Sequence, residues 1–447
     1  MKNSLIDMKA RSPWSSLRDK KVIKISPKTG NVNGIVTIPG SKSFTNRALI
    51  LSALATGKSV ISGVLKSDDS YWCLETLRNL GVGISINDDI VSIEGLNGMW
   101  SERGEPLYIG AAGTIARFLP GVLTIANKGS WEIHASKRMS ERPIKPLIDA
   151  LLQTKASIKY LGQEGYYPLM VKGSGFNGGD IPISGALSSQ FISGLLLAAP
   201  YAKETVNIAI LDHIVQKSYV NITLDLMEKF GAEIQYDKNL SHIKIEPKRY
   251  VAQHIHIEPD ISTASYFLAL AAITNGRIRI PNINYQTKQP DIQLTDILAR
   301  MGCKVTKGAN FIELQGPPRL KGGFEINMKE MSDQALTVAV IAPFADGPIT
   351  IKEVAHIRHH ESDRINAICT SLSKLNIKVT EFEDGLTVYP GEPTPTLLQS
   401  YDDHRVAMAL SLIGSRVEGI MIENPGCVSK TCPTYFDLLK KLGLGVS

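Results

Sequence analysis

Long apolar runs, paired cysteines and blocks of one charge are all missing from this 447-residue sequence. No apolar stretch reaches the 18 or more residues of a membrane-spanning helix, and candidates such as 191–200 are interrupted by Ser, Gly or Pro. The five cysteines are odd in number and widely spaced, which argues against a disulfide framework and favours a reducing cytoplasm. Residues 1–20 lack the apolar core of a signal peptide, so we interpret them as an N-terminal extension.

The charge and aromatic content weigh against a nucleic-acid surface. Lys plus Arg number 49 against 43 Asp plus Glu, but the basic residues form no block, and aromatic residues make up only 6%. A non-catalytic basic binding module for RNA stays an alternative of a different class. The length suits two domains, and 43% hydrophobic with 21% charged residues is the balance of a folded globular chain.

One pattern repeats about every seventy residues. Each copy has a turn with small polar or charged residues and then a run rich in Ala, Leu, Ile, Ser and Gly. The anchors of the six copies are Ser43, Thr114, Ser189, Thr263, Asp333 and His404, separated by 71, 75, 74, 70 and 71 residues. Side chains of this kind before an apolar run predict capped helix N-termini. Because the runs are apolar nearly all round, we expect these helices to be buried.

Strands and a second helix complete each repeat. Short β-branched runs with Asp- or Gly-containing turns, as in 84–95 and 377–390, predict paired strands. A more amphipathic helix recurs, for example at 71–82 and 219–232. The pattern therefore predicts an α/β protein of two domains, with buried helices in the middle of each domain and sheets outside.

Cations gather where the apolar helices are predicted to begin. A helix N-terminus attracts anions through its free N–H groups and its dipole. A single Lys or Arg is usually solvated surface charge, but a set at repeat-equivalent places predicts a substrate site with more than one anionic group. The set comprises Lys42, Arg47, Arg117, Arg138, Arg142, Arg364, Arg405 and Lys430.

Two carboxylates and one glycine-rich turn are further candidates. Asp333 lies at a predicted helix start, where capping is an equally good interpretation. Glu361 precedes Arg364 by three residues, the spacing of a simple helical ion pair. The turn at 110–114 looks like a phosphate loop but fits neither nucleotide-binding motif, so helix capping is as good an interpretation.

The histidines allow several interpretations. His356 and His360 are four residues apart, as zinc ligands on a helix are, but no third ligand is indicated and we do not favour a metal site. Asp403 precedes His404 and either orients its imidazole or helps to cap the helix.

Taken in order, seven motifs strongly resemble the 5-enolpyruvylshikimate-3-phosphate (EPSP) synthase family: PGSKSFTNRA, GTIAR, KRMSERPI, SSQF, ESDR, DHR and SKT. The resemblance covers about 24–445. It implies a two-domain inside-out α/β barrel of six βαβαββ repeats, three per domain. Residues 21–40 with 259–447 would form one domain and 41–258 the other. It implies no metal or organic cofactor, and we expect a monomer that binds neither nucleic acid nor membrane.

The family transfers the enolpyruvyl group of phosphoenolpyruvate to the 5-hydroxyl of shikimate 3-phosphate through a tetrahedral intermediate and releases phosphate. Both substrates are phosphorylated carboxylates, which agrees with the pattern of cations. The resemblance makes Asp333 the base and Glu361 the acid, with Lys42 as a third catalytic residue. It implies phosphoenolpyruvate contacts from Lys42, Gly113, Arg138, Gln190, Arg364, Arg405 and Lys430. It implies shikimate 3-phosphate contacts from Lys42, Ser43, Arg47, Ser188, Ser189, Gln190, Gln216, Tyr219, Asp333, His356 and His360.

Four residues depart from the family's usual pattern: Ala111 stands for Asn, Gln216 for Ser, His356 for Asn and His360 for Lys. The last replaces a permanent cation by a group that titrates near neutral pH. We therefore expect phosphate affinity to fall as the pH rises through the titration of His360.

The nearest rival family is the UDP-N-acetylglucosamine enolpyruvyl transferase, which shares the fold and the donor. That family usually has a cysteine on a mobile loop of its second repeat, whereas here no cysteine lies between Cys73 and Cys303. The motifs SSQF and KRMSERPI also favour the shikimate branch.

Overall fold

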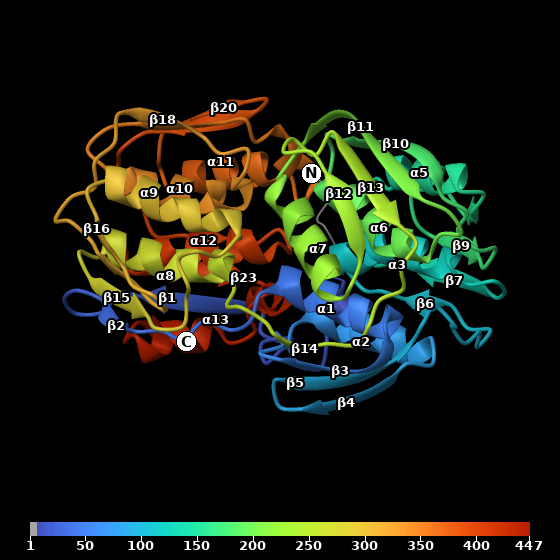
Figure 1. Cartoon of the computed structure of the whole chain (residues 1–447). Coiled ribbons are helices and arrows are strands. Elements are labelled where there is room, and N and C mark those ends of the chain that lie inside the picture. Colours follow the sequence, from blue (N-terminus) through green and yellow to red (C-terminus); the bar gives the residue numbers. More distant parts are fainter. Residues whose placement is uncertain (1–6) are drawn as a thin grey trace. The chain divides into compact units, whose positions relative to one another are not determined.

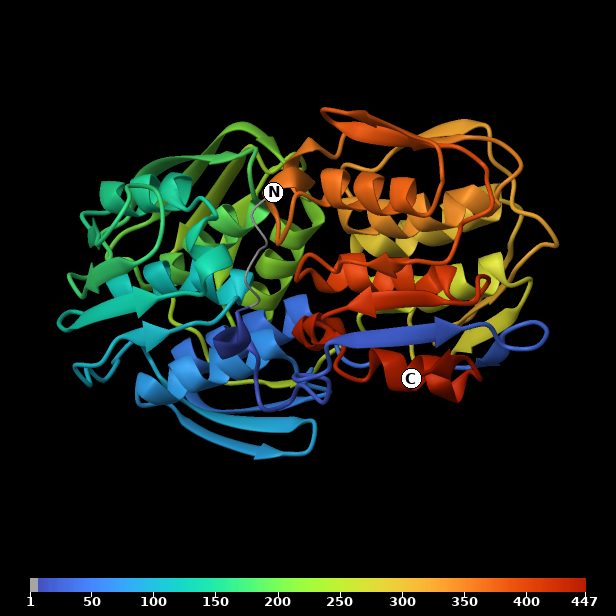
Figure 2. The same ribbon diagram turned by 180° about the vertical axis from the view of Figure 1, so that it is seen from behind.

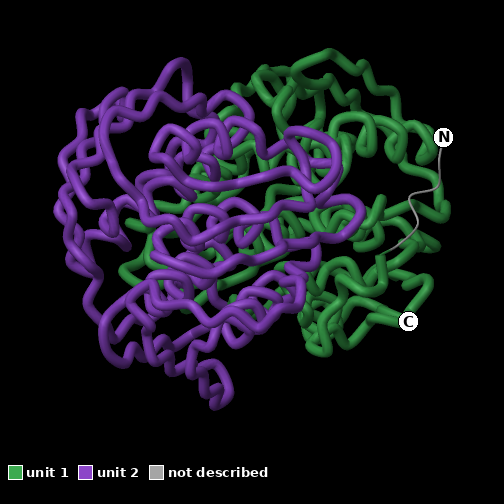
Figure 3. The backbone as a smooth tube through the Cα atoms, turned by 90° about the vertical axis from the view of Figure 1, so that its right-hand side faces the viewer, with its two compact units in different colours: residues 1–39, 259–447 green, residues 40–258 purple. Residues whose placement is uncertain are grey.

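The computed structural model describes residues 7–447, which form two compact units (Figure 3). Unit 1 contains residues 1–39, of which 1–6 lie outside the described part, and 259–447; unit 2 contains 40–258. The chain thus passes between the units twice. Glycine is required at position 40, because a Cβ there would collide with the carbonyl oxygen of Gly63.

Each unit has three four-stranded sheets of one plan, in which a parallel pair is extended by two antiparallel strands. In unit 2 the sheets, in strand order, are β14 (His254–His256), β3 (Thr56–Ser62), β5 (Ile90–Leu96) and β4 (Gly83–Asn87); β6 (Leu107–Tyr108), β7 (Ser130–His134), β9 (Leu169–Lys172) and β8 (Ser157–Tyr160); and β10 (Gly179–Gly185), β11 (Val206–Ile214), β13 (His242–Glu246) and β12 (Glu233–Tyr236).

Unit 1 repeats the plan. Its sheets are β2 (Asn33–Ile35), β15 (Arg277–Ile280), β17 (Ile312–Gln315) and β16 (Lys304–Lys307); β18 (Phe324–Asn327), β19 (Ile349–Lys352), β21 (Gly385–Val388) and β20 (Val379–Phe382); and β22 (Leu397–Leu398), β23 (Ile420–Glu423), β1 (Val22–Ser26) and β24 (Gly445–Val446).

The helices predicted from the apolar runs form the interior of each unit, and the sheets lie outside them (Figure 1). They are α1 (Lys42–Leu54), α3 (Gly113–Thr124) and α6 (Ser189–Ala198) in unit 2, and α8 (Ile261–Ile273), α10 (Ala335–Ile341) and α12 (His404–Ile413) in unit 1. All 13 residues of α8 are buried, as expected of a helix that is apolar on every side. The predicted inside-out arrangement is confirmed.

The second helix of each repeat is also present. These helices are α2 (Asp68–Asn79), α5 (Lys145–Gln153), α7 (Ser218–Lys229), α9 (Leu294–Arg300), α11 (Arg364–Lys374) and α13 (Tyr435–Lys441). Shorter pieces are α4 (Lys137–Ser140) and the 3₁₀ turns η1 (Met8–Ala10), η2 (Ala199–Tyr201), η3 (Pro290–Gln293), η4 (Ser332–Gln334), η5 (Ala342–Phe344), η6 (Ala355–His359) and η7 (Pro425–Lys430).

Three of the sheets are completed by strands from distant parts of the chain. At the end of unit 2, β14 pairs with β3 near its start, and β2 pairs with β15 about 240 residues later. Figure 2 shows the blue strand β1 beside the red strand β23, in a register that joins Val22 to Glu423. The two helices of each repeat are therefore close in sequence, whereas three sheets contain a strand from a distant part of the chain.

The predicted side-chain caps are present at only some of the central helices. Ser188, Asp260 and Asp403 cap α6, α8 and α12. The capping interpretation is wrong for Thr114, which lies inside α3, and for Asp333, which lies in η4 before α10. These two side chains have other partners, because Asn46 donates to the Thr114 hydroxyl at 2.6 Å and an arginine binds Asp333. The anchor Ser43 likewise lies inside its helix, α1.

The described part of the predicted N-terminal extension packs on unit 1. Ala10, Arg11 and Ser12 are buried, and the backbone N–H of Asn424 donates to the carbonyl oxygen of Lys21 at 2.7 Å. Among the described residues no helix is long and apolar enough to span a membrane. The five cysteines are all buried as free thiols.

Candidate active site

Arg364 is the centre of a buried ion-pair network in unit 1. It is the first residue of α11, and only 1% of it is exposed. Its Nη1 donates to Asp333 Oδ1 at 2.8 Å, and its Nη2 donates to Glu361 Oε2 at 3.0 Å. Its Nε donates to Asp403 Oδ2 at 2.8 Å. Burial acts to lower the pKa of Arg364, but the three carboxylates outweigh it and hold that pKa above its ordinary value.

Two further cations bind the same carboxylates from the other side. Arg405 Nη2 lies 2.8 Å from Asp333 Oδ2, and Lys430 Nζ lies 3.0 Å from Glu361 Oε1. Both cations are buried. Each of the two predicted catalytic carboxylates is therefore held between Arg364 and one other cation, at the N-termini of helices that attract anions.

The two histidines of the site have polar partners within unit 1. His360 Nδ1 lies 3.1 Å from Arg364 Nη1; a guanidinium can only donate, so this nitrogen accepts and the imidazole is neutral with its proton on Nε2. His356 Nε2 lies 2.8 Å from the hydroxyl of Ser332, and the two imidazole rings are 5.8 Å apart. Within residues 7–447 there is no group of three or more His, Cys, Asp or Glu side chains that could hold a metal ion.

Asp403 has one partner that the sequence did not reveal. Its Oδ1 lies 3.6 Å from His404 Nδ1, the distance of an ion pair and longer than a hydrogen bond; the alternative interpretation, that it helps to cap the helix, is confirmed. It caps α12 by accepting from the Arg405 N–H at 2.9 Å, and its second oxygen binds Arg364. The two residues are 39 positions apart, and no periodicity in the sequence connects them.

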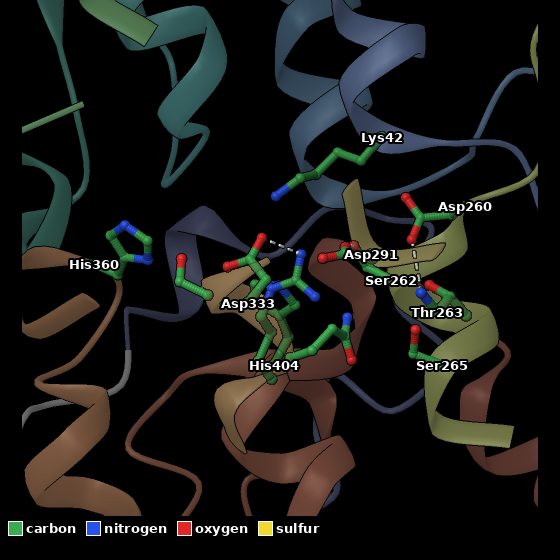
Figure 4. Close-up of polar contacts among 12 residues, drawn as sticks. Lys42, Asp260, Ser262, Thr263, Ser265, Asp291, Asp333, His360 and His404 are labelled. Atoms are coloured by element: carbon green, nitrogen blue, oxygen red, sulfur yellow. Dashed lines mark hydrogen bonds and ion pairs between the residues drawn. The ribbon is translucent and has the colours of Figure 1, made fainter. Parts of the chain in front are cut away.

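A second overlooked carboxylate, Asp291 of η3, lies beside the start of α8. Asp291 is only 2% exposed; Ser262 donates to its Oδ2, and its Oδ1 has no hydrogen-bond partner among the described residues. Figure 4 shows it beside Ser262, next to the Asp260 cap. Burial, together with the charge of Asp333, raises the pKa of Asp291 to about 7, although Arg405 acts to lower it.

In unit 2, Arg47 joins three helices. Only 1% of it is exposed, and its Nε donates to Thr223 Oγ1 of α7 at 2.7 Å. Further hydrogen bonds reach Ser193 of α6 and the carbonyl oxygens of Ser43 and Tyr219. Burial lowers the pKa of Arg47 to about 10, so it stays charged at neutral pH. Its predicted contact with substrate stays a prediction, because these four hydrogen bonds all hold the scaffold of unit 2.

Lys42 and Gly113 begin two neighbouring helices. Lys42 is the first residue of α1, and its Nζ lies 3.7 Å from Asp69 Oδ2. Gly113 begins α3, where a Cβ would lie 3.1 Å from Arg142 Nη1 and 3.8 Å from Arg117 Nη1. The hydrogen bond between Asn46 and Thr114 ties these two helix starts together. Two guanidinium groups thus flank the start of α3, an arrangement that attracts anions.

The remaining predicted residues of unit 2 lie at α4, α6 and α7. Ser188 caps α6, Ser189 begins it, and Gln190 follows with a buried Oε1 that accepts no hydrogen bond from the described residues. Gln216 precedes α7 in a left-handed conformation (φ 50°). Arg138 is more exposed and lies 3.4 Å from Glu141.

The architecture is that of the enolpyruvyl transferases. The enolpyruvyl transferase NikO from Streptomyces tendae shares the fold with a TM-score of 0.78 at 18% identity, over 96% of this chain and 98% of that chain. EPSP synthase from Acinetobacter baumannii matches with a TM-score of 0.80 at 26% identity, over 96% of this chain and 100% of that chain.

Sequence comparison narrows the class to one family. The family model of EPSP synthase (3-phosphoshikimate 1-carboxyvinyltransferase) matches residues 27–439. The 3-phosphoshikimate 1-carboxyvinyltransferase 2 of Halalkalibacterium halodurans is 56% identical over 442 residues, 98% of either chain. The 3-phosphoshikimate 1-carboxyvinyltransferase of a Nostoc species is 40% identical over 414 residues, 92% of this chain and 97% of that one. The chain belongs to the EPSP synthase family, and the prediction from its motifs is confirmed.

Proposed function

We propose that Asp333 and Glu361 are the base and the acid of the reaction that this family catalyses. The reaction transfers the enolpyruvyl group of phosphoenolpyruvate to the 5-hydroxyl of shikimate 3-phosphate and releases phosphate, a step of aromatic amino-acid biosynthesis. The observation that supports these roles is the buried network in which Arg364 binds both carboxylates, with Arg405 and Lys430 on their other oxygens.

In the addition step, the 5-hydroxyl oxygen bonds to C2 of phosphoenolpyruvate. Asp333 accepts the hydroxyl proton, and Glu361 in its protonated form donates a proton to the C3 methylene, which becomes a methyl group. The product is a tetrahedral intermediate that still carries the phosphate. Arg364, Arg405 and Lys430 are fixed cations that stabilise its charge without reorganising.

In the elimination step, the bond between C2 and the phosphate oxygen breaks. Glu361, now a carboxylate, takes a proton from the methyl group and regenerates the double bond. The proton held by Asp333 passes to the departing phosphate, so both carboxylates return to their initial states.

We assign the substrate contacts from the family motifs. Phosphoenolpyruvate is bound by Lys42, Gly113, Arg138, Gln190, Arg364, Arg405 and Lys430. Shikimate 3-phosphate is bound by Lys42, Ser43, Arg47, Ser188, Ser189, Gln190, Gln216, Tyr219, Asp333, His356 and His360. The unpartnered amide oxygen of Gln190 supports its place in this set, because a buried acceptor gains stability from a substrate hydroxyl. Lys42, the third catalytic residue, supplies a further cation at a helix N-terminus.

We further propose a monomer that works in the cytoplasm. One chain supplies every residue assigned to the two substrates, and its five buried free thiols suit a reducing compartment. Sedimentation of the purified protein tests the monomer; a dimer at assay concentration contradicts it.

Release of phosphate from the two substrates tests the function. The wild-type protein is expected to release phosphate only when shikimate 3-phosphate is present, and not when UDP-N-acetylglucosamine replaces it. Asp333→Asn and Glu361→Gln should each lower turnover by about 10²- to 10⁴-fold, because each removes one proton transfer. Glu383→Gln, at an exposed carboxylate of the same unit, is the control and should turn over normally. Release with UDP-N-acetylglucosamine, or full activity of either variant, contradicts the proposal.

A further inference from the structure

Residues 7–20, which we call the N-terminal strap, lie before residues 27–439, the part of the chain that the family model matches. Arg11 is the buried cation of the strap: only 8% of it is exposed. Its guanidinium Nη2 donates to the carboxylate Oδ1 of Asp402, 391 residues later in the sequence. A buried arginine bound to a distant carboxylate fixes the two segments against each other.

Asp402 joins three segments of unit 1. The same Oδ1 that binds Arg11 accepts a hydrogen bond of 2.8 Å from Asn424 Nδ2. Tyr401 and Asp402 both have left-handed backbone (φ 55°), and so does Asn424 (φ 48°). This conformation is uncommon for non-glycine residues, although Asn and Asp adopt it more readily than most. The hydrogen bonds of Asp402 to Arg11 and Asn424 hold the loop in this shape.

The strap also lies directly on η7. A Cβ on Gly426 would come within 2.6 Å of the carbonyl oxygen of Leu17, so only glycine allows the two backbones to approach this closely. The strap then leads into β1, which pairs with β23, the strand that ends just before Asn424. The strap thus contacts the segment 424–430 at Gly426 and the loop 400–403 at Asp402.

These two segments carry cations of the candidate active site. The loop at 400–403 ends in Asp403, which caps α12 at the N–H of Arg405 and binds Arg364. The segment 424–430 ends in Lys430, the partner of Glu361. The strap contacts at Asp402 and Gly426 are therefore only three and four residues from Arg405 and Lys430 on the same backbone.

We propose that the N-terminal strap is a positioning element for phosphoenolpyruvate binding, acting through the contact of Arg11 with Asp402. The strap contributes no residue to the proposed substrate contacts; it fixes the backbone from which Arg405 and Lys430 extend. This inference rests on the proposed function for its substrate. Fixed cations bind the substrate and the intermediate alike, so loosening them should weaken binding more than it slows the chemical step.

Steady-state kinetics of Arg11→Gln test the strap. The KM for phosphoenolpyruvate should rise by roughly tenfold, with kcat changed by less than about threefold and the KM for shikimate 3-phosphate unchanged. Arg11→Lys keeps the charge and should restore part of the affinity. Arg18→Gln removes the same charge from an exposed position of the strap and should behave as wild type. Unchanged KM in Arg11→Gln, or an equal rise in Arg18→Gln, overturns the proposal.

Amide hydrogen exchange gives a second measurement that needs no activity. In Arg11→Gln, exchange should become faster at 400–405 and 424–430 but not in the buried helix α8. Unchanged exchange in both segments, or faster exchange throughout unit 1, overturns the strap as a positioning element. The two proposals fail separately: a wild-type protein without phosphate release contradicts the function, whereas the strap fails in the comparison of variant with wild type.

Discussion

At the scale of single residues, the proposed acid and base are already bound by the cations expected to bind the substrates. Asp333 lies between Arg364 and Arg405, and Glu361 lies between Arg364 and Lys430. A carboxylate between two cations is stabilised in its charged form. The phosphate and carboxylate groups of the substrates add negative charge beside these fixed cations, which favours the protonated form of Glu361. Substrate charge therefore helps to convert Glu361 into an acid.

Asp291 predicts a pH dependence of stability. Burial and the charge of Asp333 raise its pKa from 3.8 to about 7, so between about pH 4 and about pH 7 the folded state holds a proton that the unfolded state has lost. The free energy of unfolding should fall as the pH rises through this window. Asp291→Asn cannot ionise and should show a flatter profile in urea unfolding. The exposed Asp437→Asn is the control; a variant of Asp291 with the wild-type slope contradicts the account.

His360 predicts a pH dependence of ligand affinity. It stands where the family usually has lysine, and its Nδ1 accepts from Arg364, with His356 and Glu361 nearby. Only a protonated imidazole adds a cation, so the affinity for inorganic phosphate should fall as the pH rises through its titration. Calorimetry of His360→Lys should give a higher affinity with a flatter pH profile. If the pH profile of His360→Lys is identical to that of the wild type, the predicted role of His360 is wrong.

The sequence indicated which single residues take part in the chemistry, but it did not indicate which residues they contact. The motifs pointed to Asp333, Glu361 and the three cations that the structure brings together in unit 1. They gave no sign of Asp403 as a partner of Arg364, or of Asp291 beside Ser262, because these pairs lie 39 and 29 residues apart in the sequence. Such contacts depend on how helix starts meet in three dimensions, which spacing along the chain does not encode.

At the scale of elements, the central helices are joined by buried polar side chains as well as by apolar packing. Arg47 of α1 bonds to Ser193 of α6 and Thr223 of α7. Asn46 bonds to Thr114 of α3. These hydrogen bonds fix the helix starts that carry Lys42, Gly113 and Gln190. A purely apolar interface would leave their relative orientation less well determined.

Replacing Arg47 should destabilise unit 2. Arg47→Met removes the guanidinium donor. The carbonyl oxygens of Ser43 and Tyr219 and the hydroxyl of Thr223 then each lose a hydrogen bond. A buried polar group left without a partner costs about 1–3 kcal/mol. Thr223 and Tyr219 keep other hydrogen bonds, so we expect a total loss of about 2–4 kcal/mol in the free energy of unfolding. The exposed Arg103→Met should change it by less than about 0.5 kcal/mol. Equal stability of the two variants would contradict the role of Arg47 as a link between helices.

The central helices and the strand pairs predicted at 84–95 and 377–390 are present, but the pairing of distant strands was not predictable. Periods of about seventy residues identified all six central helices, because runs that are apolar on every side can only be buried. The same periods did not show that β14, β1 and β2 complete sheets of distant repeats. Strands of three to five residues carry little pattern of their own, and their pairing is decided by the long-range closure of each unit.

At the scale of the whole molecule, six copies of one plan are divided between two units by an insertion. Unit 2 enters unit 1 after Pro39 and leaves it before Pro259, so both ends of the chain belong to the same unit. This is why β1, from the beginning of the chain, pairs with β23 near its end. It also explains how the N-terminal strap reaches the segments that carry Arg405 and Lys430.

In the proposed mechanism, transfer proceeds by protonation and deprotonation of C3, with Glu361 moving the proton. Reaction in heavy water followed by NMR tests it most directly. During turnover by the wild-type protein, the methylene group of the product should acquire deuterium, because a transient methyl group takes up solvent deuterium and then loses either isotope. Glu361→Gln should bind both substrates and incorporate almost none. Product formed at the wild-type rate without deuterium, or normal incorporation by Glu361→Gln, would contradict the account.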